Sequence, residues 1–193
     1  MNTGDTSYVL ISAAMVMFMV PGLALFYGGM VRAKNVLATV IQSMFALDLV
    51  SVLWVLIVYS LTFGPDIGHV IGGLRFAGLN NISSGGMVPA PTVPAFAFVV
   101  FQLFFAAITP AIITGAFAER MKFSAFAVFT ALWLLCIYTP MAHWVWAPGG
   151  WLHDLGALDF AGGTVVHISS GVAGLAAGLV SALEPEPIKI RSN

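Results

Sequence analysis

Five long apolar stretches dominate this sequence. They cover approximately residues 8–31, 36–63, 94–118, 123–145 and 163–183. A helix needs about 20 mostly apolar residues to cross the hydrocarbon core of a bilayer. Every stretch is that long, and together they use most of the 193 residues. The sequence therefore predicts an all-α integral membrane protein with five transmembrane helices in one membrane domain, residues 1–183.

The low charge of the chain points the same way. Only 8% of its residues are charged, whereas a soluble domain carries about 25%. So few charges could not cover a surface that faces water, and no metal-ligand or nucleotide motif is present. We therefore expect neither an enzyme nor a cofactor, and no nucleic-acid partner. The single cysteine, Cys136, provides no disulfide framework.

The first apolar stretch is predicted to be a retained helix rather than a signal peptide. Residues 1–7 contain Asp5 but no Lys or Arg, whereas a signal peptide begins with positive charge and has a shorter apolar region.

The basic residues predict the orientation in the membrane. With five helices, six of the seven Lys and Arg residues fall on one side: Arg32, Lys34, Arg120, Lys122, Lys189 and Arg191. Arg75 alone falls on the other side. Because cytoplasmic loops carry an excess of Lys and Arg, we expect the N-terminus outside and the C-terminus inside, with residues 184–193 as a cytoplasmic tail.

Ionisable residues inside a membrane are costly and are therefore candidate functional residues. His167, near the start of the fifth stretch, could relay a proton or hold a small polar solute, or it could simply be packed against a backbone carbonyl. Asp159 precedes the same stretch, where it could cap the helix, attract a cation, or do both. Asp48 lies midway through the second stretch and suggests a structural or subunit-contact role. His143 lies nearer an interface.

Aromatic residues accompany these groups. Trp144 and Trp146, at the outer end of the fourth stretch, fit either an interfacial aromatic belt or a cation–π seat. Phe104 and Phe105 in the third stretch fit either packing or a hydrophobic gate. Together with His167, these residues suggest a pathway with an aromatic outer face and a histidine inside.

Small residues in the fifth stretch predict close helix contacts. Gly171, Gly174 and Gly178 lie among alanines, and small residues let membrane helices approach one another. We therefore expect this helix to pack against other helices rather than lipid.

Five segments resemble motifs of one known family. They are residues 21–32 (PGLALFYGGMVR), 51–54 (SVLW), 59–64 (YSLTFG), 115–121 (GAFAERM) and 156–167 (GALDFAGGTVVH). In this order they are similar to the first half of the ammonium transporter, methylammonium permease and Rhesus protein family. Gly163 followed by Thr164 resembles the ammonium transporter branch.

The resemblance implies a role for each of four residues. Phe105 would be one of two stacked phenylalanines that gate the outer pore, and Trp146 would help to form the outer recruitment site for ammonium. Asp159 would be the buried aspartate below that site. His167 would be the first of twin pore histidines that accept and relay the proton when ammonium splits into ammonia and a proton.

The resemblance also implies an architecture and partners. Family members have two inverted five-helix repeats and a last helix, which places the substrate path between the repeats. This sequence resembles the first repeat, so the second half would come from a longer chain or a partner. A multi-pass cell-membrane location, a homotrimer, a PII-type cytoplasmic regulator, and transport of ammonium with methylammonium as an analogue are implied. The alternative is a non-transporting sensor or assembly subunit.

Overall fold

The computed structural model describes residues 1–83, 85–87 and 89–183. The expected tail, residues 184–193, lies outside the described residues. Five helical spans are long and apolar enough to cross a membrane: Thr3–Gly28, Ala33–Phe63, Ala95–Ala116, Phe123–Asp154 and Gly163–Ser181. The predicted all-α, five-helix membrane architecture is confirmed.

The first two spans are joined by a short turn. Helix α1 (Thr3–Gly28) begins at Asn2, whose side chain accepts hydrogen bonds from the backbone N–H groups of Gly4 and Asp5. The second span comprises four consecutive elements: η1 (Ala33–Asn35), α2 (Val36–Leu53), the π-helical turn η2 (Trp54–Val58) and α3 (Tyr59–Phe63).

The remaining spans are also built of several elements. The third span contains α4 (Ala95–Ile113) and η4 (Thr114–Ala116). The fourth contains α5 (Phe123–Trp133), the π-helical turn η5 (Leu134–Tyr138) and α6 (Thr139–Trp146), followed by the short α7 (Trp151–Asp154). The fifth contains the π-helical turn η6 (Gly163–Ile168) and α8 (Ser169–Leu183).

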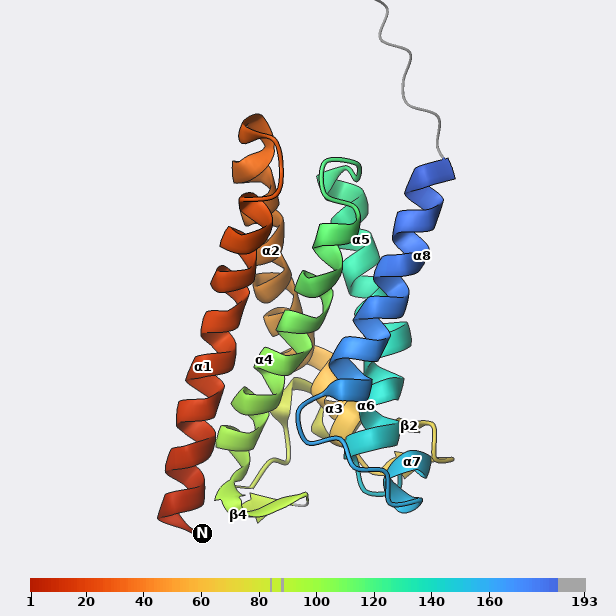
Figure 1. Ribbon diagram of the computed structural model, residues 1–193. Helices are drawn as coiled ribbons and strands as arrows, with labels where there is room; N and C mark the ends of the chain where they lie inside the picture. The colour runs from red at the N-terminus through yellow and green to blue at the C-terminus, as the bar shows by residue number, and fades with distance from the viewer. Residues whose placement is uncertain (84, 88, 184–193) are drawn as a thin grey trace, which may run out of the picture.

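Short strands occur only between the second and third spans among the described residues. Strand β1 (Asp66–Ile67) pairs antiparallel with β2 (Ile71–Gly72), so that Asp66 lies opposite Gly72. The 3₁₀ segment η3 (Leu74–Leu79) follows, and then β3 (Gly86–Met87) pairs with β4 (Ala90–Pro94). These elements lie at the end of the bundle that holds the N-terminus (Figure 1).

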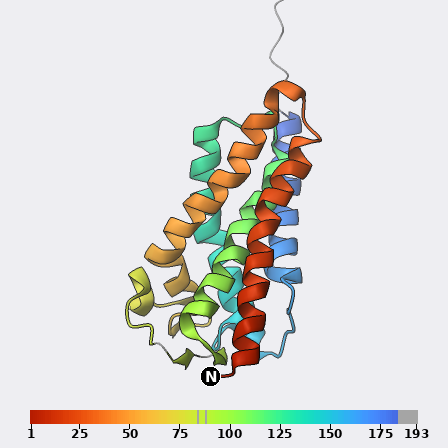
Figure 2. The same ribbon diagram turned by 90° about the vertical axis from the view of Figure 1, so that its left-hand side faces the viewer.

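Helix α4 occupies the middle of the bundle. It contacts α1 and α2 on one side and α8 on the other (Figure 1). The largest fully buried side chains, which form the core between the spans, are Trp54, Tyr59, Tyr138, Phe117 and Phe126. Figure 2 shows the spans running side by side along one axis, as a bundle that crosses a bilayer requires.

The basic residues of the two helical turns gather at one end of the bundle. The turn between α1 and α2, the turn between α4 and α5, and the end of α8 all lie opposite the N-terminus (Figure 1). Arg32, Lys34, Arg120 and Lys122 belong to those two turns. We call this end the inner end and the other the outer end, following the positive-inside rule. The orientation itself stays a prediction.

A carboxylate ties the two inner turns together. Glu119 accepts hydrogen bonds from the Arg32 backbone N (2.9 Å), Arg32 Nε (3.0 Å) and Asn35 Nδ2 (2.7 Å). The Asn35 amide, followed by the Arg32 groups, lowers the pKa of Glu119 to about 2. Glu119 has a φ of 67°, an uncommon conformation for a residue with a side chain. We call this set the inner clasp.

Helix α8 packs less closely than its glycines predicted. A Cβ atom on Gly174 would lie 3.6 Å from Ala116 Cβ, but one on Gly171 or Gly178 would have nothing within 4 Å. Val172 and Leu175 are 62% and 65% exposed. The expectation that other helices cover this helix is therefore wrong for the described residues, because α8 lies at the side of the bundle and only one face meets η4 and α4.

Candidate functional site

The turn before His167 has a conformation that requires glycine. Gly162 has a φ of 77°, and a Cβ atom added to it would lie 2.7 Å from Val166 Cγ2. The backbone N–H groups of Val166 and His167 both donate to the Gly162 carbonyl oxygen, each at 2.9 Å. This sharing belongs to the π-helical turn η6, a rare geometry that is frequent at functional sites.

Asp159 caps the start of this turn. Its Oδ1 accepts a hydrogen bond from Gly163 N at 2.7 Å, and its Oδ2 accepts from Thr164 N at 2.9 Å and Val165 N at 3.1 Å. These N–H groups have no partner within a helix, and a negative charge is stabilised beside them. The half-buried carboxylate thus makes the capping bonds that the sequence suggested.

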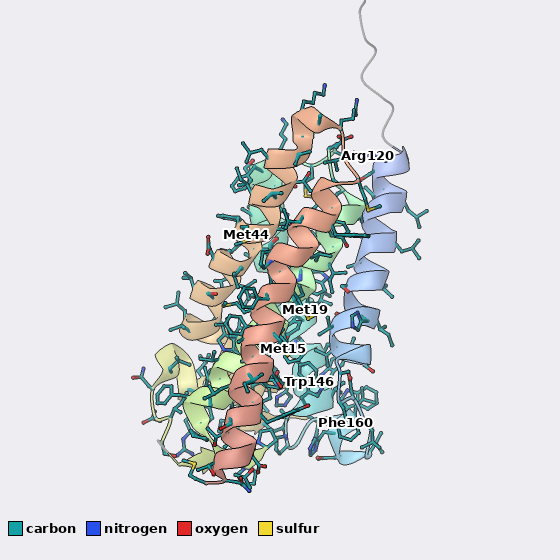
Figure 3. All side chains as sticks on the ribbon, turned by 60° about the vertical axis from the view of Figure 1, so that its left-hand side comes forward. Met15, Met19, Met44, Arg120, Trp146 and Phe160 are labelled. Carbon is teal, nitrogen blue, oxygen red and sulfur yellow. The ribbon has the colours of Figure 1, made fainter. Side chains whose placement is uncertain are left out.

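Trp146 joins the Asp159 loop to the third span. It ends α6, and its indole Nε1 donates to the Asp159 carbonyl oxygen at 2.9 Å. Its ring meets Phe105 edge-on, with centroids 5.9 Å apart and an interplanar angle of 69°. Figure 3 shows Trp146 near Phe160, far from Arg120. The tryptophan therefore lies at the outer end, fixed by a hydrogen bond and an aromatic contact.

An apolar cluster continues inward from this contact. Phe104, Phe105 and Trp146 pack against buried residues of α1, α4 and η6, namely Val16, Val20, Ile108 and Val166. These contacts form an apolar surface that extends inward from Phe105.

His167 is the ionisable residue of η6. Its side chain is exposed although it lies in the fifth span, and its ring makes no hydrogen bond or ion pair with any described residue. It is therefore not a histidine packed against a carbonyl within the described structure. A neutral imidazole with both nitrogens available can donate at one and accept at the other.

The structure thus brings three of the four predicted residues into direct contact. Phe105 contacts Trp146, Trp146 bonds to Asp159, and we call these three residues the outer mouth. His167 follows Val166, a member of the apolar cluster, along η6. No hydrogen bond or ring contact joins His167 to the other three among the described residues. Asp48 lies elsewhere, exposed on α2, and it makes no hydrogen bond or ion pair with a described residue.

A second set of ionisable residues lies at the outer end, and of these the sequence had singled out only His143. The buried His143 lies 2.7 Å from the Thr62 carbonyl oxygen through Nδ1, and 2.9 Å from Asp66 Oδ1 through Nε2. His69 donates its backbone N–H to Asp66 Oδ2 at 3.1 Å, and its Nδ1 lies 2.6 Å from the Gly149 carbonyl oxygen. We call this set the outer clasp.

The outer clasp changes the acidity of its carboxylate. The hydrogen bond from His143, followed by that from the His69 backbone, lowers the pKa of Asp66. No sequence spacing relates Asp66 to His143, which are 77 residues apart. The only local signal was an ionisable residue just beyond an apolar stretch. The described residues contain no group of three His, Cys, Asp or Glu side chains placed to hold a metal ion.

Comparison with known proteins identifies this arrangement. Residues 7–185 match the sequence profile of the Ammonium Transporter Family. The chain is 53% identical over 180 residues to an ammonium transporter of Bacillus subtilis, covering 93% of this chain and 44% of the relative. It therefore spans less than half the length of the curated relative.

Solved structures agree with the sequence match. The crystal structure of Saccharomyces cerevisiae Mep2 superposes with a TM-score of 0.84 at 36% identity, covering 93% of this chain and 40% of that one. A structure titled "Sensor Amt Protein" superposes with a TM-score of 0.83 at 29% identity, covering 91% and 44%. The fold is thus shared with part of these larger membrane proteins, and the chain belongs to the ammonium transporter family.

Proposed function

We propose that this chain forms one wall of a pathway that carries ammonium nitrogen across the cell membrane as ammonia. Ammonium would arrive at the outer mouth, lose a proton there, and continue as the neutral molecule along the apolar wall. The observation that carries the proposal is His167, an exposed imidazole in the fifth span that has no hydrogen-bond or ion-pair partner among the described residues.

The outer mouth has groups suited to a small cation. The face of a tryptophan attracts a cation by about 0.5–1 kcal/mol at an exposed site, and Trp146 is held in place by its bond to the Asp159 carbonyl. The Asp159 carboxylate adds negative charge close by, although its oxygens are engaged with η6. Asp159 would therefore act mainly by holding the mouth together and by its charge.

The apolar wall would provide the selectivity. Moving an ion into an apolar environment costs far more than moving a neutral polar molecule. Potassium cannot shed its charge, whereas ammonium can release a proton. Phe105 would restrict the entrance, and His167 would accept or relay the proton through its two nitrogens.

Uptake of labelled methylammonium tests the role of His167. We expect His167→Ala to lower uptake by about 100-fold, as loss of a proton-transfer group does. His153→Ala is the matched control, because His153 is an exposed outer histidine paired with Asp154 at 3.1 Å. Unchanged uptake in His167→Ala, with both variants present in the membrane in equal amounts, would contradict the proposal.

The other wall of the pathway would come from the rest of a longer chain or from a partner. Apolar side chains of α1 and α8 are uncovered, including Met15 and Met19 (Figure 3) and Leu175. The intact mass of the natively expressed protein separates the two sources. A mass near twice 20.4 kDa indicates a continuing chain, and a mass of 20.4 kDa indicates a partner.

A second candidate function is ammonium sensing without transport. It is favoured by the likeness to the structure titled "Sensor Amt Protein". A sensor would bind ammonium, as measured by calorimetry, while proteoliposomes containing it took up no methylammonium. A homotrimer and a PII-type regulator at the inner turns, residues 29–32 and 117–122, are further proposals that family membership supports.

A further inference from the structure

We propose that the buried His143 and the partly exposed Asp66 hold one proton between them, and that the outer clasp positions Trp146 at the outer mouth. The consequence for transport rests on the function proposed above, whereas the protonation of the pair does not. Both residues lie outside the four that the sequence assigned to the pathway.

The hydrogen-bond partners of His143 fix where its protons lie. The Thr62 carbonyl oxygen can only accept, so Nδ1, at 2.7 Å, must carry a hydrogen. Nε2 faces Asp66 Oδ1 at 2.9 Å, and one further hydrogen is needed between these two atoms. Without it, the Nε2 lone pair would face the carboxylate. The pair therefore holds one more proton than a neutral imidazole beside an ionised carboxylate would hold.

The surroundings of Asp66 favour an imidazolium and a carboxylate. Asp66 Oδ2 accepts the His69 backbone N–H, and a hydrogen bond to a carboxylate favours its charged form. His143 is 0% exposed, and the Asp66 side chain is only 23% exposed. The proton is thus shielded from water on the histidine side.

The outer clasp fixes the chain on both sides of Trp146, at His143 before it and at Gly149 after it. His143 lies in α6, three residues before Trp146 and on the neighbouring part of the helix surface. The turn that follows Trp146 packs on Asp66, because a Cβ atom on Gly149 would lie 2.7 Å from Asp66 Cβ. The Gly149 carbonyl is also bonded to His69. Movement of the clasp would therefore move both sides of the tryptophan.

The other charged groups near the clasp come from the same two outer loops. His69 Nδ1 lies 3.8 Å from Asp66 Oδ2. Asp154 accepts a hydrogen bond from Gly149 N at 3.3 Å and pairs with His153. No lysine or arginine side chain forms an ion pair with this set among the described residues. The proton on His143 is thus the buried positive charge that balances Asp66.

The sign of the pH dependence of Asp66 follows from its lowered pKa. The contribution of this carboxylate to stability is present above the ordinary carboxyl range and is lost as the pH falls through the lowered value.

Nitrogen-15 NMR of the protein in bilayers tests the pair directly. With only four histidines in the chain, one ring is expected to show both nitrogens protonated at pH 7.5, and His143→Gln identifies it by removing that signal. Asp66→Asn is expected to convert this ring to a neutral one with a single N–H, because an amide can donate to the bare Nε2. A neutral His143 in the unaltered protein would overturn the proposal.

Methylammonium uptake tests the positioning of Trp146. Because Asp66→Asn retains a neutral hydrogen bond, we expect the half-saturating concentration to rise by about threefold or more, with a smaller change in maximal rate, as when binding alone is weakened. Asp5→Asn, an exposed outer aspartate in α1, is expected to behave like the unaltered protein. A half-saturating concentration in Asp66→Asn equal to that of the unaltered protein would overturn the positioning role. Absence of uptake by the unaltered protein would instead refute transport, while the NMR spectrum would still decide the pair.

Discussion

The two ends of the bundle are closed by the same device with different chemistry. At each end, one carboxylate accepts hydrogen bonds from backbone and side-chain groups of a distant segment. In the inner clasp, Glu119 accepts hydrogen bonds from Arg32 and Asn35. In the outer clasp, Asp66 accepts hydrogen bonds from His143 and His69. The inner cation is an arginine that stays charged at every accessible pH, whereas the outer partner is a histidine, which is charged only when it is protonated.

Burial separates the two clasps further. Arg32 is 66% exposed, so water screens its pairing with Glu119. His143 is completely buried and the Asp66 side chain is 23% exposed, so water screens this pairing less than the inner one. The inner end is thus closed by a tie whose cation keeps its charge, while the tie that closes the outer end depends on the proton that we assign to His143.

The largest effect is expected from His143→Ala. Removing the His143 ring takes the side-chain donor from Asp66 Oδ1 and leaves the Thr62 carbonyl oxygen without its partner. We expect the thermal midpoint to fall by about 8 °C, as measured by the unfolding of purified protein in detergent. A fall of less than about 2 °C would show that the outer clasp contributes no more than a surface pair.

The next largest effect is expected from Glu119→Gln. The amide has one accepting oxygen for three donors, so we expect a midpoint lower by about 5 °C. Because the pKa of Glu119 is lowered to about 2, its contribution is present above the ordinary glutamate range and is lost as the pH falls towards 2. The difference between variant and unaltered protein should therefore be constant from pH 6 to pH 9 and shrink below pH 4. A difference that changed between pH 6 and pH 9 would remove the contrast between the clasps.

A pair of glycine substitutions isolates the packing of the outer clasp. Gly149 and Gly68 have φ values of 92° and 65°, so alanine is strained at both. Only at Gly149 would the new Cβ meet Asp66; at Gly68 nothing lies within 4 Å. We expect Gly149→Ala to lower the midpoint by about 4 °C and Gly68→Ala by about 2 °C. Equal effects would show that strain alone matters at Gly149.

The smallest effect is expected from Arg32→Lys. The backbone N–H of residue 32 still donates to Glu119, and an exposed ion pair contributes at most about 1 kcal/mol. We expect a midpoint lower by about 1–2 °C, and a difference that disappears in 1 M salt, where exposed charges are screened. A larger or salt-independent loss would show that the arginine has a buried role.

Part of the candidate site was readable from local sequence. Asp159 caps N–H groups only four to six residues ahead, so an aspartate before an apolar stretch was enough to predict it. The glycines of α8 misled for the opposite reason. Their spacing shows that one face of the helix carries small side chains and could approach another helix closely. Whether a neighbour lies on that face depends on where the helix lies in the bundle.

The sequence by itself determined the number of spans, the grouping of basic residues and the family, because apolar length and motif order are properties of contiguous segments. Only the tertiary structure decided that Glu119 meets Arg32 and Asp66 meets His143, residues 87 and 77 positions apart. It also decided that His167 stays without a partner among the described residues while His143 is fully engaged. Both are histidines in apolar surroundings, and their difference lies in the packing of segments distant in sequence.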